Sequence, residues 1–145
     1  TAVAREAPEA RVTVDAPPGL AVSAAPSLLS RAVGNVLRNA MHHAGSAGPL
    51  EISATRISMK NERGPVPEVR LVIADHGPGV PAEALPKLFD PFYRVDEART
   101  RETGGVGLGL AIVKSCVQAC GGSVTAQARP DGTPGLVIEF RLPAA

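Results

Sequence analysis

A glycine-rich segment at residues 104–109, Gly-Gly-Val-Gly-Leu-Gly, limits most strongly what this chain can fold into. An apolar pattern with helical spacing follows it directly and extends to residue 119. Backbone without Cβ atoms can approach a bulky group closely and can adopt positive φ at low steric cost. The unpaired N–H groups at the start of the next helix would face that group, as they do where proteins hold phosphates. The segment therefore predicts a nucleotide site at the start of a helix over residues 106–119.

Composition places the chain among globular domains that bind neither nucleic acid nor lipid through broad charge. It has 145 residues, of which 44% are hydrophobic and 20% charged, and its net charge is +1. It contains no Trp, one Tyr and three Phe, which is too few aromatic residues for stacking on single-stranded nucleic acid. Cys116 and Cys120 are expected to be small buried thiols in a reducing compartment.

Hydrophobic periodicity predicts three helices and six strands, with an apolar helix face formed by Leu29, Val33, Val36, Leu37 and Ala40. The expected helices are 27–43, 82–87 and 106–119, and the expected strands are 11–14, 20–23, 50–57, 68–74, 123–128 and 136–142. Strands 11–14 and 20–23 are expected to pair, and residues 60–67 to form a polar hairpin loop. Hairpins outnumber crossovers, so we expect an α+β fold: a two-layer α/β sandwich whose mixed, mostly antiparallel sheet carries helices on one face.

Asn35, Asn39 and His42 occupy positions i, i+4 and i+7 of the first long helix and so share one stripe. Asn is a poor helix former, so two on one stripe indicate a function, although a solvated polar face is the alternative. An amide oxygen is a hard, neutral ligand that suits Mg²⁺. The neighbouring His42 and His43 point about 100° apart, which makes it difficult for them to share a metal.

Asp75 follows an apolar strand and precedes Gly77 and Gly79. A carboxylate here could accept a hydrogen bond from the exocyclic amine of adenine, while a plain Asp-Gly turn is the alternative. Residues 77–82 also match the dinucleotide fingerprint G-x-G-x-x-A. We reject a Rossmann fold because that fingerprint requires a helix to begin at once and a second parallel strand to follow, whereas Pro and a long loop come next.

Residues 89–105 form a long, charged segment that is poor in apolar periodicity, and such a loop is typical of a functional or mobile element. Phe89 and Phe92 are expected to anchor one end of it. Arg94, Arg99 and Arg101 are placed to reach a terminal phosphate when the segment closes. An ordinary charged surface loop is the alternative.

Four motifs, taken in order, resemble those of the catalytic ATP-binding domain of bacterial sensor histidine kinases, within the GHKL ATPase superfamily. They are Asn-x-x-x-Asn-Ala, Asp-x-Gly-x-Gly, Phe-x-Pro-Phe-Tyr-Arg and Gly-x-Gly-Leu-Gly-Leu, and they span Asn35 to Leu110. The flanking strands extend the resemblance over nearly the whole chain. Residues 89–113 look most like membrane-anchored kinases of the envelope-stress type.

This resemblance implies that the chain binds Mg-ATP. Asn39 would coordinate Mg²⁺ and take part in catalysis with Arg94, Asp75 would recognise the adenine amine, and residues 91–104 would form a lid over ATP. The remaining nucleotide-binding positions implied by the resemblance are Asn35, His42, His43, Gly77, Gly79, Phe92, Arg99, Arg101, Gly105, Val106, Gly107, Leu108, Gly109 and Leu110.

The phosphoaccepting histidine of this family is followed by an acidic residue, and neither His42, His43 nor His76 matches that motif. We therefore expect residues 1–145 to be one catalytic domain, the cytoplasmic part of a longer inner-membrane homodimer, that does not autophosphorylate alone. Its expected partners are the dimerisation and phosphoacceptor domain of the same protein and a cognate response regulator, with no nucleic acid. The alternatives are an anti-sigma-type serine kinase, another stand-alone GHKL ATPase, or a degenerate ATP-binding module that only docks a partner.

Overall fold

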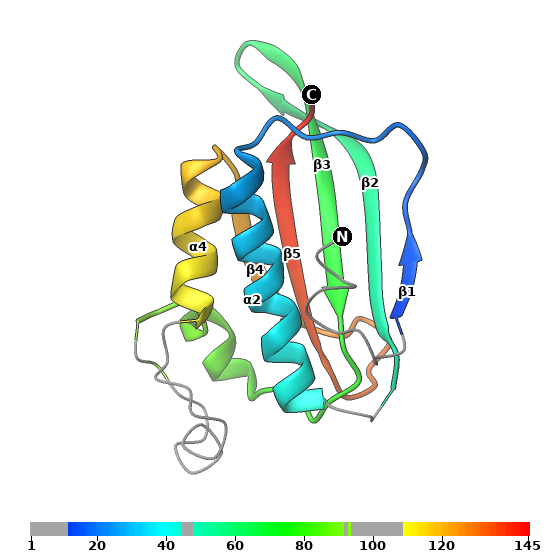
Figure 1. The fold of residues 1–145 in the computed structure, drawn as a ribbon, viewed down its shortest axis with the longest axis vertical. Helices are drawn as coiled ribbons and strands as arrows, with labels where there is room; N and C mark the ends of the chain where they lie inside the picture. Colours follow the sequence, from blue (N-terminus) through cyan, green and yellow to red (C-terminus); the bar gives the residue numbers. More distant parts are fainter. Residues whose placement is uncertain (1–11, 45–47, 92, 94–108) are drawn as a thin grey trace.

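The chain forms one five-stranded sheet with its helices packed on one face (Figure 1). The computed structural model describes residues 12–44, 48–91, 93 and 109–145. The strands lie in the order β1-β2-β3-β5-β4, and β1 pairs with β2 in parallel while the other neighbours are antiparallel. Their bounds are β1 Val12–Asp15, β2 Leu50–Asn61, β3 Gly64–Ala74, β4 Ser123–Ala128 and β5 Leu136–Pro143. The predicted α+β sandwich with a mixed, mostly antiparallel sheet is confirmed.

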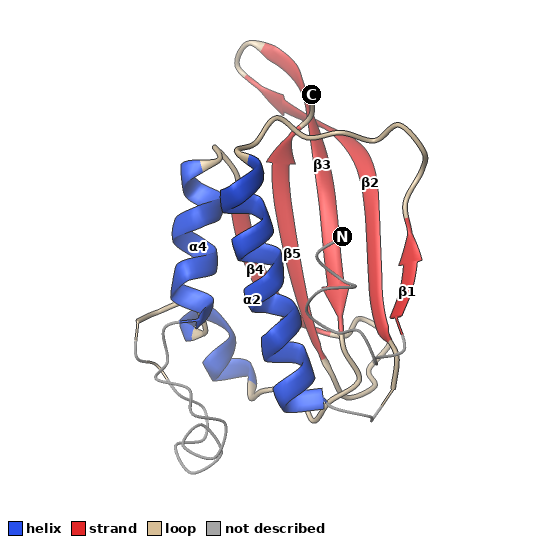
Figure 2. Cartoon of the chain, in the orientation of Figure 1, coloured by secondary structure: helices blue, strands red, loops and turns tan. Residues whose placement is uncertain are grey.

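Two α-helices and one short 3-10 helix complete the described part of the chain. Figure 2 shows the helices as one layer and the sheet as the other. Helix α2 (Pro26–Ala44) connects the parallel strands β1 and β2, and α4 (Gly109–Ala119) lies between β3 and β4 in the sequence, after the 3-10 helix η1 (Ala82–Lys87). The described helices include none with the length and apolarity that a membrane span needs.

The core lies between α2, α4 and the sheet face that they cover. Phe140 of β5 and Leu37 of α2 are fully buried there, with exposed fractions of 0%. The predicted apolar face of α2 is confirmed, because Val36, Leu37 and Ala40 are buried and Leu29 and Val33 pack against the same cluster. Phe89, the predicted anchor at the start of the segment 89–105, also belongs to this core. Cys116 is buried and Cys120 is half-buried, and both are free thiols.

The predicted pairing of residues 11–14 with residues 20–23 is wrong. Strand β1 pairs in parallel with β2, in a register that aligns Val12 with Leu50. Val22 instead forms an isolated antiparallel bridge with Ala144 at the end of the chain. The Pro-Gly turn between the two segments suggested a hairpin, but the crossover through α2 places β1 beside β2.

The predicted loop at residues 60–67 is also wrong, because β2 and β3 continue through it to a tight turn in which Asn61 is aligned with Gly64. This segment contains two prolines, which are uncommon inside strands because proline cannot donate to the ladder. The carbonyl oxygen of Pro67 accepts a hydrogen bond from the Ala144 N–H, so its ring nitrogen also faces away from β2. No ladder hydrogen bond to β2 is lost, and the strand tolerates proline there.

Candidate functional site

The predicted site residues of α2, β3 and α4 meet at one end of the sheet, where α2 and β3 end and α4 and β5 begin (Figure 1). Asn35 of α2 donates from Nδ2 to the carbonyl oxygen of Gly109, the first residue of α4, across 3.4 Å. Asp75 is the first residue after β3. The fold therefore brings the described parts of the asparagine, aspartate and glycine motifs to the same end of the molecule.

The asparagine stripe lies on the part of α2 that approaches this end. Asn35 is half-buried and accepts a hydrogen bond on Oδ1 from the guanidinium of Arg38. Asn39 is half-buried as well, and its amide makes no hydrogen bond to any residue that the structure describes. His42 is exposed, whereas the side chain of His43 lies outside the described part. Asn39 is thus the amide of the stripe that the surrounding protein does not engage, as far as the described residues extend.

Asp75 is a carboxylate held in the protein by one of its two oxygens. Its exposed fraction is 5%. Oδ1 accepts hydrogen bonds from the N–H groups of Gly77 and Leu136, each at 3.0 Å. No described residue donates to Oδ2, and the described part contains no fully buried side-chain oxygen without a partner. It follows that Oδ2 keeps contact with solvent and can accept a hydrogen bond from a ligand.

The two glycines after Asp75 play different parts in shaping this site. Gly77 is buried and supplies one of the N–H donors to the carboxylate. Gly79 has φ of +73°, a conformation that side chains rarely adopt, and a Cβ at this position would lie 3.2 Å from the carbonyl oxygen of Gly135. The segment after β3 is therefore packed directly on the backbone that precedes β5.

Sequence reasoning missed the residues of the β4–β5 loop that hold Asp75. The Asp75 N–H donates to the carbonyl oxygen of Leu136 at 3.0 Å, so the ladder between β3 and β5 continues one residue into the site. Gly135 has φ of +148°, and an added Cβ would lie 2.2 Å from the Asp75 carbonyl oxygen. Arg129 donates from Nη1 to that same oxygen at 3.1 Å. A glycine immediately before the expected strand 136–142 was the available signal.

Charged and titratable side chains from three segments contact one another next to Asp75. Glu51 of β2 lies 3.2 Å from His76 Nε2 and 3.4 Å from Arg129 Nη2. His76 Nδ1 also lies 2.8 Å from the carbonyl oxygen of Pro49, so both ring nitrogens face acceptors. In the adjoining loop, hydrogen bonds from the side chain and backbone N–H of Thr133 lower the pKa of Asp131 to about 2. Polar contacts thus link β2, the segment after β3 and the β4–β5 loop around Asp75.

Part of the predicted site falls outside the described residues. This part comprises Phe92, Arg94, Arg99, Arg101, Gly105, Val106, Gly107 and Leu108, with most of the lid at 91–104. The predicted start of the second long helix at residue 106 lies there too, and the described helix begins at Gly109. Gly109 is exposed, and Leu110 is half-buried against the core. The lid and phosphate-loop roles therefore stay predictions.

Comparisons with known proteins identify the family to which this fold belongs. The family described as histidine kinase-, DNA gyrase B-, and HSP90-like ATPase matches residues 24–145. The sensor histidine kinase CpxA of Escherichia coli K12 is 37% identical over 132 residues, which cover 90% of this chain and 27% of that protein. The structure of the mycobacterial sensor histidine kinase MprB is 32% identical with a TM-score of 0.78, and the match covers 98% of this chain and 88% of that one.

The chain belongs to the histidine kinase-, DNA gyrase B-, and HSP90-like ATPase family, and it is homologous to the catalytic ATP-binding domains of sensor histidine kinases. A structure of full-length ShkA in complex with AMPPNP is similar too, with 28% identity and a TM-score of 0.73 over 99% of this chain and 28% of that one. That protein is known with an ATP analogue, and the chain here spans only about a quarter of its length.

Proposed function

We propose that this domain binds Mg-ATP at the end of the sheet marked by Asp75 and donates the γ-phosphate to a histidine on a separate domain. Membership of this ATPase family supports ATP as the ligand. The site is assigned from the state of Asp75, whose buried carboxylate is fixed through Oδ1 while Oδ2 remains open to a ligand.

Adenine recognition follows from the chemistry of that free oxygen. An ionised carboxylate accepts hydrogen bonds and cannot donate them. It therefore favours the exocyclic amine of adenine and repels the carbonyl that guanine carries at the same position. A hydrogen bond to a charged group is worth about 1.5 to 3 kcal/mol, enough for roughly tenfold to hundredfold discrimination.

The asparagine stripe fits magnesium held mainly by phosphate. The described residues contain no group of three His, Cys, Asp or Glu side chains that could enclose a metal ion. Mg²⁺ dehydrates reluctantly and binds through few protein ligands together with phosphates, so a single amide oxygen such as that of Asn39 suits it. Asn35 donates to the first residue of α4, and helix starts are where proteins commonly hold phosphates, which supports a metal site on this stripe. When bound, Mg²⁺ would neutralise charge on the transferring phosphoryl group.

The whole protein is proposed to be a membrane-anchored homodimeric sensor kinase with this domain in the cytoplasm. The relatives named as sensor histidine kinases are longer than this chain, which covers 27% of CpxA. The missing length would supply the dimerisation domain with its acceptor histidine, and a response regulator would receive the phosphoryl group. Relatives of this kind favour a histidine kinase over the anti-sigma-type serine kinase.

Calorimetric titration of the purified chain with ATP, with and without Mg²⁺, tests the binding site. Asn39→Ala is expected to abolish the Mg²⁺ dependence of binding, and Asp75→Asn to weaken ATP binding by about tenfold or more. Gln118→Ala removes an exposed amide from α4 and serves as the matched control. If Asn39→Ala binds Mg-ATP like the parent, the metal assignment is wrong.

Incubation with labelled ATP and the purified acceptor domain tests the reaction. A histidine kinase would transfer label to that domain as an acid-labile phosphohistidine. Acid-stable phosphoserine on an added partner would instead favour the serine kinase, and no transfer at all would favour a module that only binds nucleotide.

A further inference from the structure

The guanidinium of Arg129, at the start of the loop between β4 and β5, is directed at the backbone of Asp75 rather than at solvent. Its side chain is only 10% exposed, and Nη1 donates to the Asp75 carbonyl oxygen across 3.1 Å. A buried cation is costly unless its hydrogen bonds are satisfied. The contact with Asp75 therefore belongs to a set of bonds that compensates for this burial.

The other nitrogens of Arg129 are engaged as well. Nε donates to Thr133 Oγ1 at 3.1 Å, and Nη2 lies 3.4 Å from both carboxylate oxygens of Glu51 and from Asp131 Oδ2. A planar guanidinium that is bound at all three nitrogens has a fixed orientation, which the single ammonium of lysine cannot reproduce. Arg129 thus connects the start of β2 with its own loop and with the end of β3.

These contacts fix the peptide that carries the site carboxylate. Asp75 exchanges hydrogen bonds with Leu136 through its N–H and through Oδ1, each at 3.0 Å. Arg129 holds the carbonyl oxygen of the same residue, where Gly135 also packs closely. A rotation of the Asp75 backbone would break the bond to Arg129 together with a bond to Leu136. The direction of Oδ2 therefore depends on Arg129, although Arg129 donates only to the main chain of Asp75.

We propose that Arg129 is a positioning residue that sets the selectivity of this site for the exocyclic amine of adenine by holding the Asp75 peptide. The proposal rests on the adenine recognition proposed above. It concerns a specific step, the aim of one carboxylate oxygen, and it differs from a general contribution of Arg129 to folding or to the attraction of anions.

Two nucleotides separate these effects: ATP, and purine riboside triphosphate, which lacks the exocyclic amine and carries the same charge. The parent is expected to bind ATP at least about tenfold more tightly than the analogue. Arg129→Met keeps the length of the side chain and removes its donors. This variant is expected to reduce the preference for ATP to roughly threefold or less, mainly through weaker ATP binding. The reason is that a carboxylate pointing in the wrong direction loses most of its hydrogen bond to the amine, and that bond accounts for the roughly tenfold preference of the parent. Loss of one positive charge weakens both nucleotides equally and leaves their ratio unchanged.

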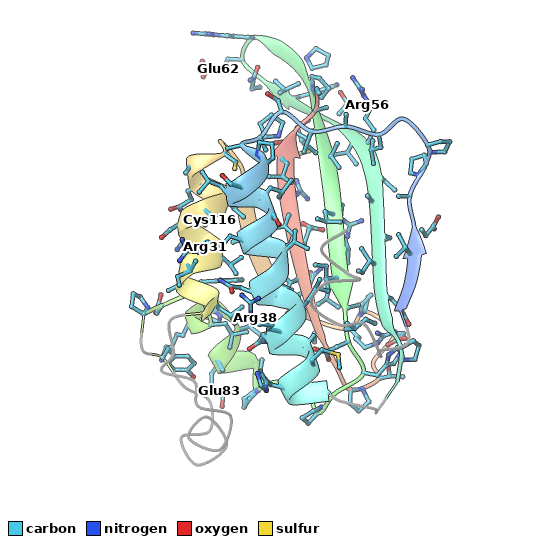
Figure 3. The ribbon with its side chains drawn as sticks, in the orientation of Figure 1. Arg31, Arg38, Arg56, Glu62, Glu83 and Cys116 are labelled. Carbon is cyan, nitrogen blue, oxygen red and sulfur yellow. The ribbon has the colours of Figure 1, made fainter. Side chains whose placement is uncertain are left out.

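Arg56→Met is the matched control, because Arg56 is exposed on β2. Figure 3 shows Arg56 toward the opposite end of the molecule from Glu83 of η1, the helix that follows the Asp75 segment in the sequence. It removes the same charge and should keep the parental preference. If Arg129→Met is too unstable to titrate, Arg129→Lys decides, since lysine keeps the charge and is expected to lose preference too. A parental preference in the deciding variant, or an equal loss of affinity for both nucleotides, overturns the proposal.

Asp75→Asn distinguishes failure of this proposal from failure of the proposed function. If Asp75→Asn removes the preference and the Arg129 variants do not, adenine recognition stands and the positioning role falls. If Asp75→Asn keeps the full preference, the Asp75 carboxylate does not recognise the base. Both the proposed adenine recognition and the positioning role of Arg129 then fall.

Discussion

Replacing Gly135 with Ala is expected to destabilise the fold far more than the same change at Gly132, three residues earlier in the same loop. Both glycines have φ in the left-handed region, at +148° and +81°. A Cβ at Gly132 would meet no heavy atom within 4 Å, whereas a Cβ at Gly135 would lie 2.2 Å from the Asp75 carbonyl oxygen and 2.6 Å from Arg129 Cδ. The pair therefore separates backbone strain, which both changes introduce, from steric overlap, which arises only at Gly135.

The expected magnitudes follow from these two contributions. Positive φ costs a residue with a Cβ about 1 to 2 kcal/mol, so Gly132→Ala should lower the free energy of unfolding by about that amount. Overpacking adds about 1 to 3 kcal/mol, which brings the loss for Gly135→Ala to about 2 to 5 kcal/mol. For a domain of this size, 1 kcal/mol corresponds to about 2 to 4 °C, so Tm should fall by about 10 °C in Gly135→Ala.

Urea unfolding followed by far-UV circular dichroism measures these losses, because the chain has no Trp and a single Tyr for fluorescence. The midpoint should shift while the slope with urea concentration stays constant. Gly79→Ala, whose Cβ would lie 3.2 Å from the Gly135 carbonyl oxygen, is expected to fall between the two other variants. Equal losses for Gly132→Ala and Gly135→Ala would refute the reasoning, because they would show that the close approach to Asp75 carries no cost.

Two further predictions concern the sheet. Burial raises the pKa of Glu139, but hydrogen bonds and charge from Arg70 and Arg141 outweigh it and hold that pKa below its ordinary value. The ionised form therefore contributes stability that is present above about pH 4.3, the unfolded value, and is lost as the pH falls through the folded pKa. Urea unfolding measures the stability difference between the parent and Glu139→Gln, which should be constant near neutral pH and shrink below about pH 4.3. A difference that does not depend on pH would contradict this. Phe140→Ala removes a side chain that is 0% exposed and should cost about 3 to 5 kcal/mol in the same assay, against less than about 0.5 kcal/mol for Val14→Ala, which is 59% exposed at the sheet edge.

Local patterns in the sequence were sufficient for most of the fold. The periodicity around Val36 and Leu37 predicted α2 and its buried face, because a helix that covers a sheet must be apolar on one side. The same reasoning failed for residues 60–67, where β2 and β3 extend as a largely exposed ribbon without a buried face. It also failed for Val22, because its bridge to Ala144 joins residues that are distant in the sequence.

The candidate site divides in the same way. Asp75 was predicted because a carboxylate after an apolar strand and before glycines has a chemical meaning that is visible locally. Arg129 was missed because its partners come from three separate segments, and nothing in its own neighbourhood in the sequence reveals that the Asp75 carbonyl oxygen lies 3.1 Å away. Gly135 was missed for a similar reason, since the close approach that requires a glycine involves the end of another strand.

The opposed directions of α2 and α4 give the site end of the molecule two electrical poles. Figure 1 shows that α2 ends at the end of the sheet where β3 ends and β5 begins, whereas α4 begins toward that end and runs away from it. A helix macrodipole is positive at its first turn and negative at its last. Anionic groups are therefore favoured beside the first turn of α4, and cations beside the last turn of α2, which follows Asn39. The phosphates of a bound nucleotide would therefore be favoured at the positive first turn of α4, and the cation that they carry at the negative end of α2.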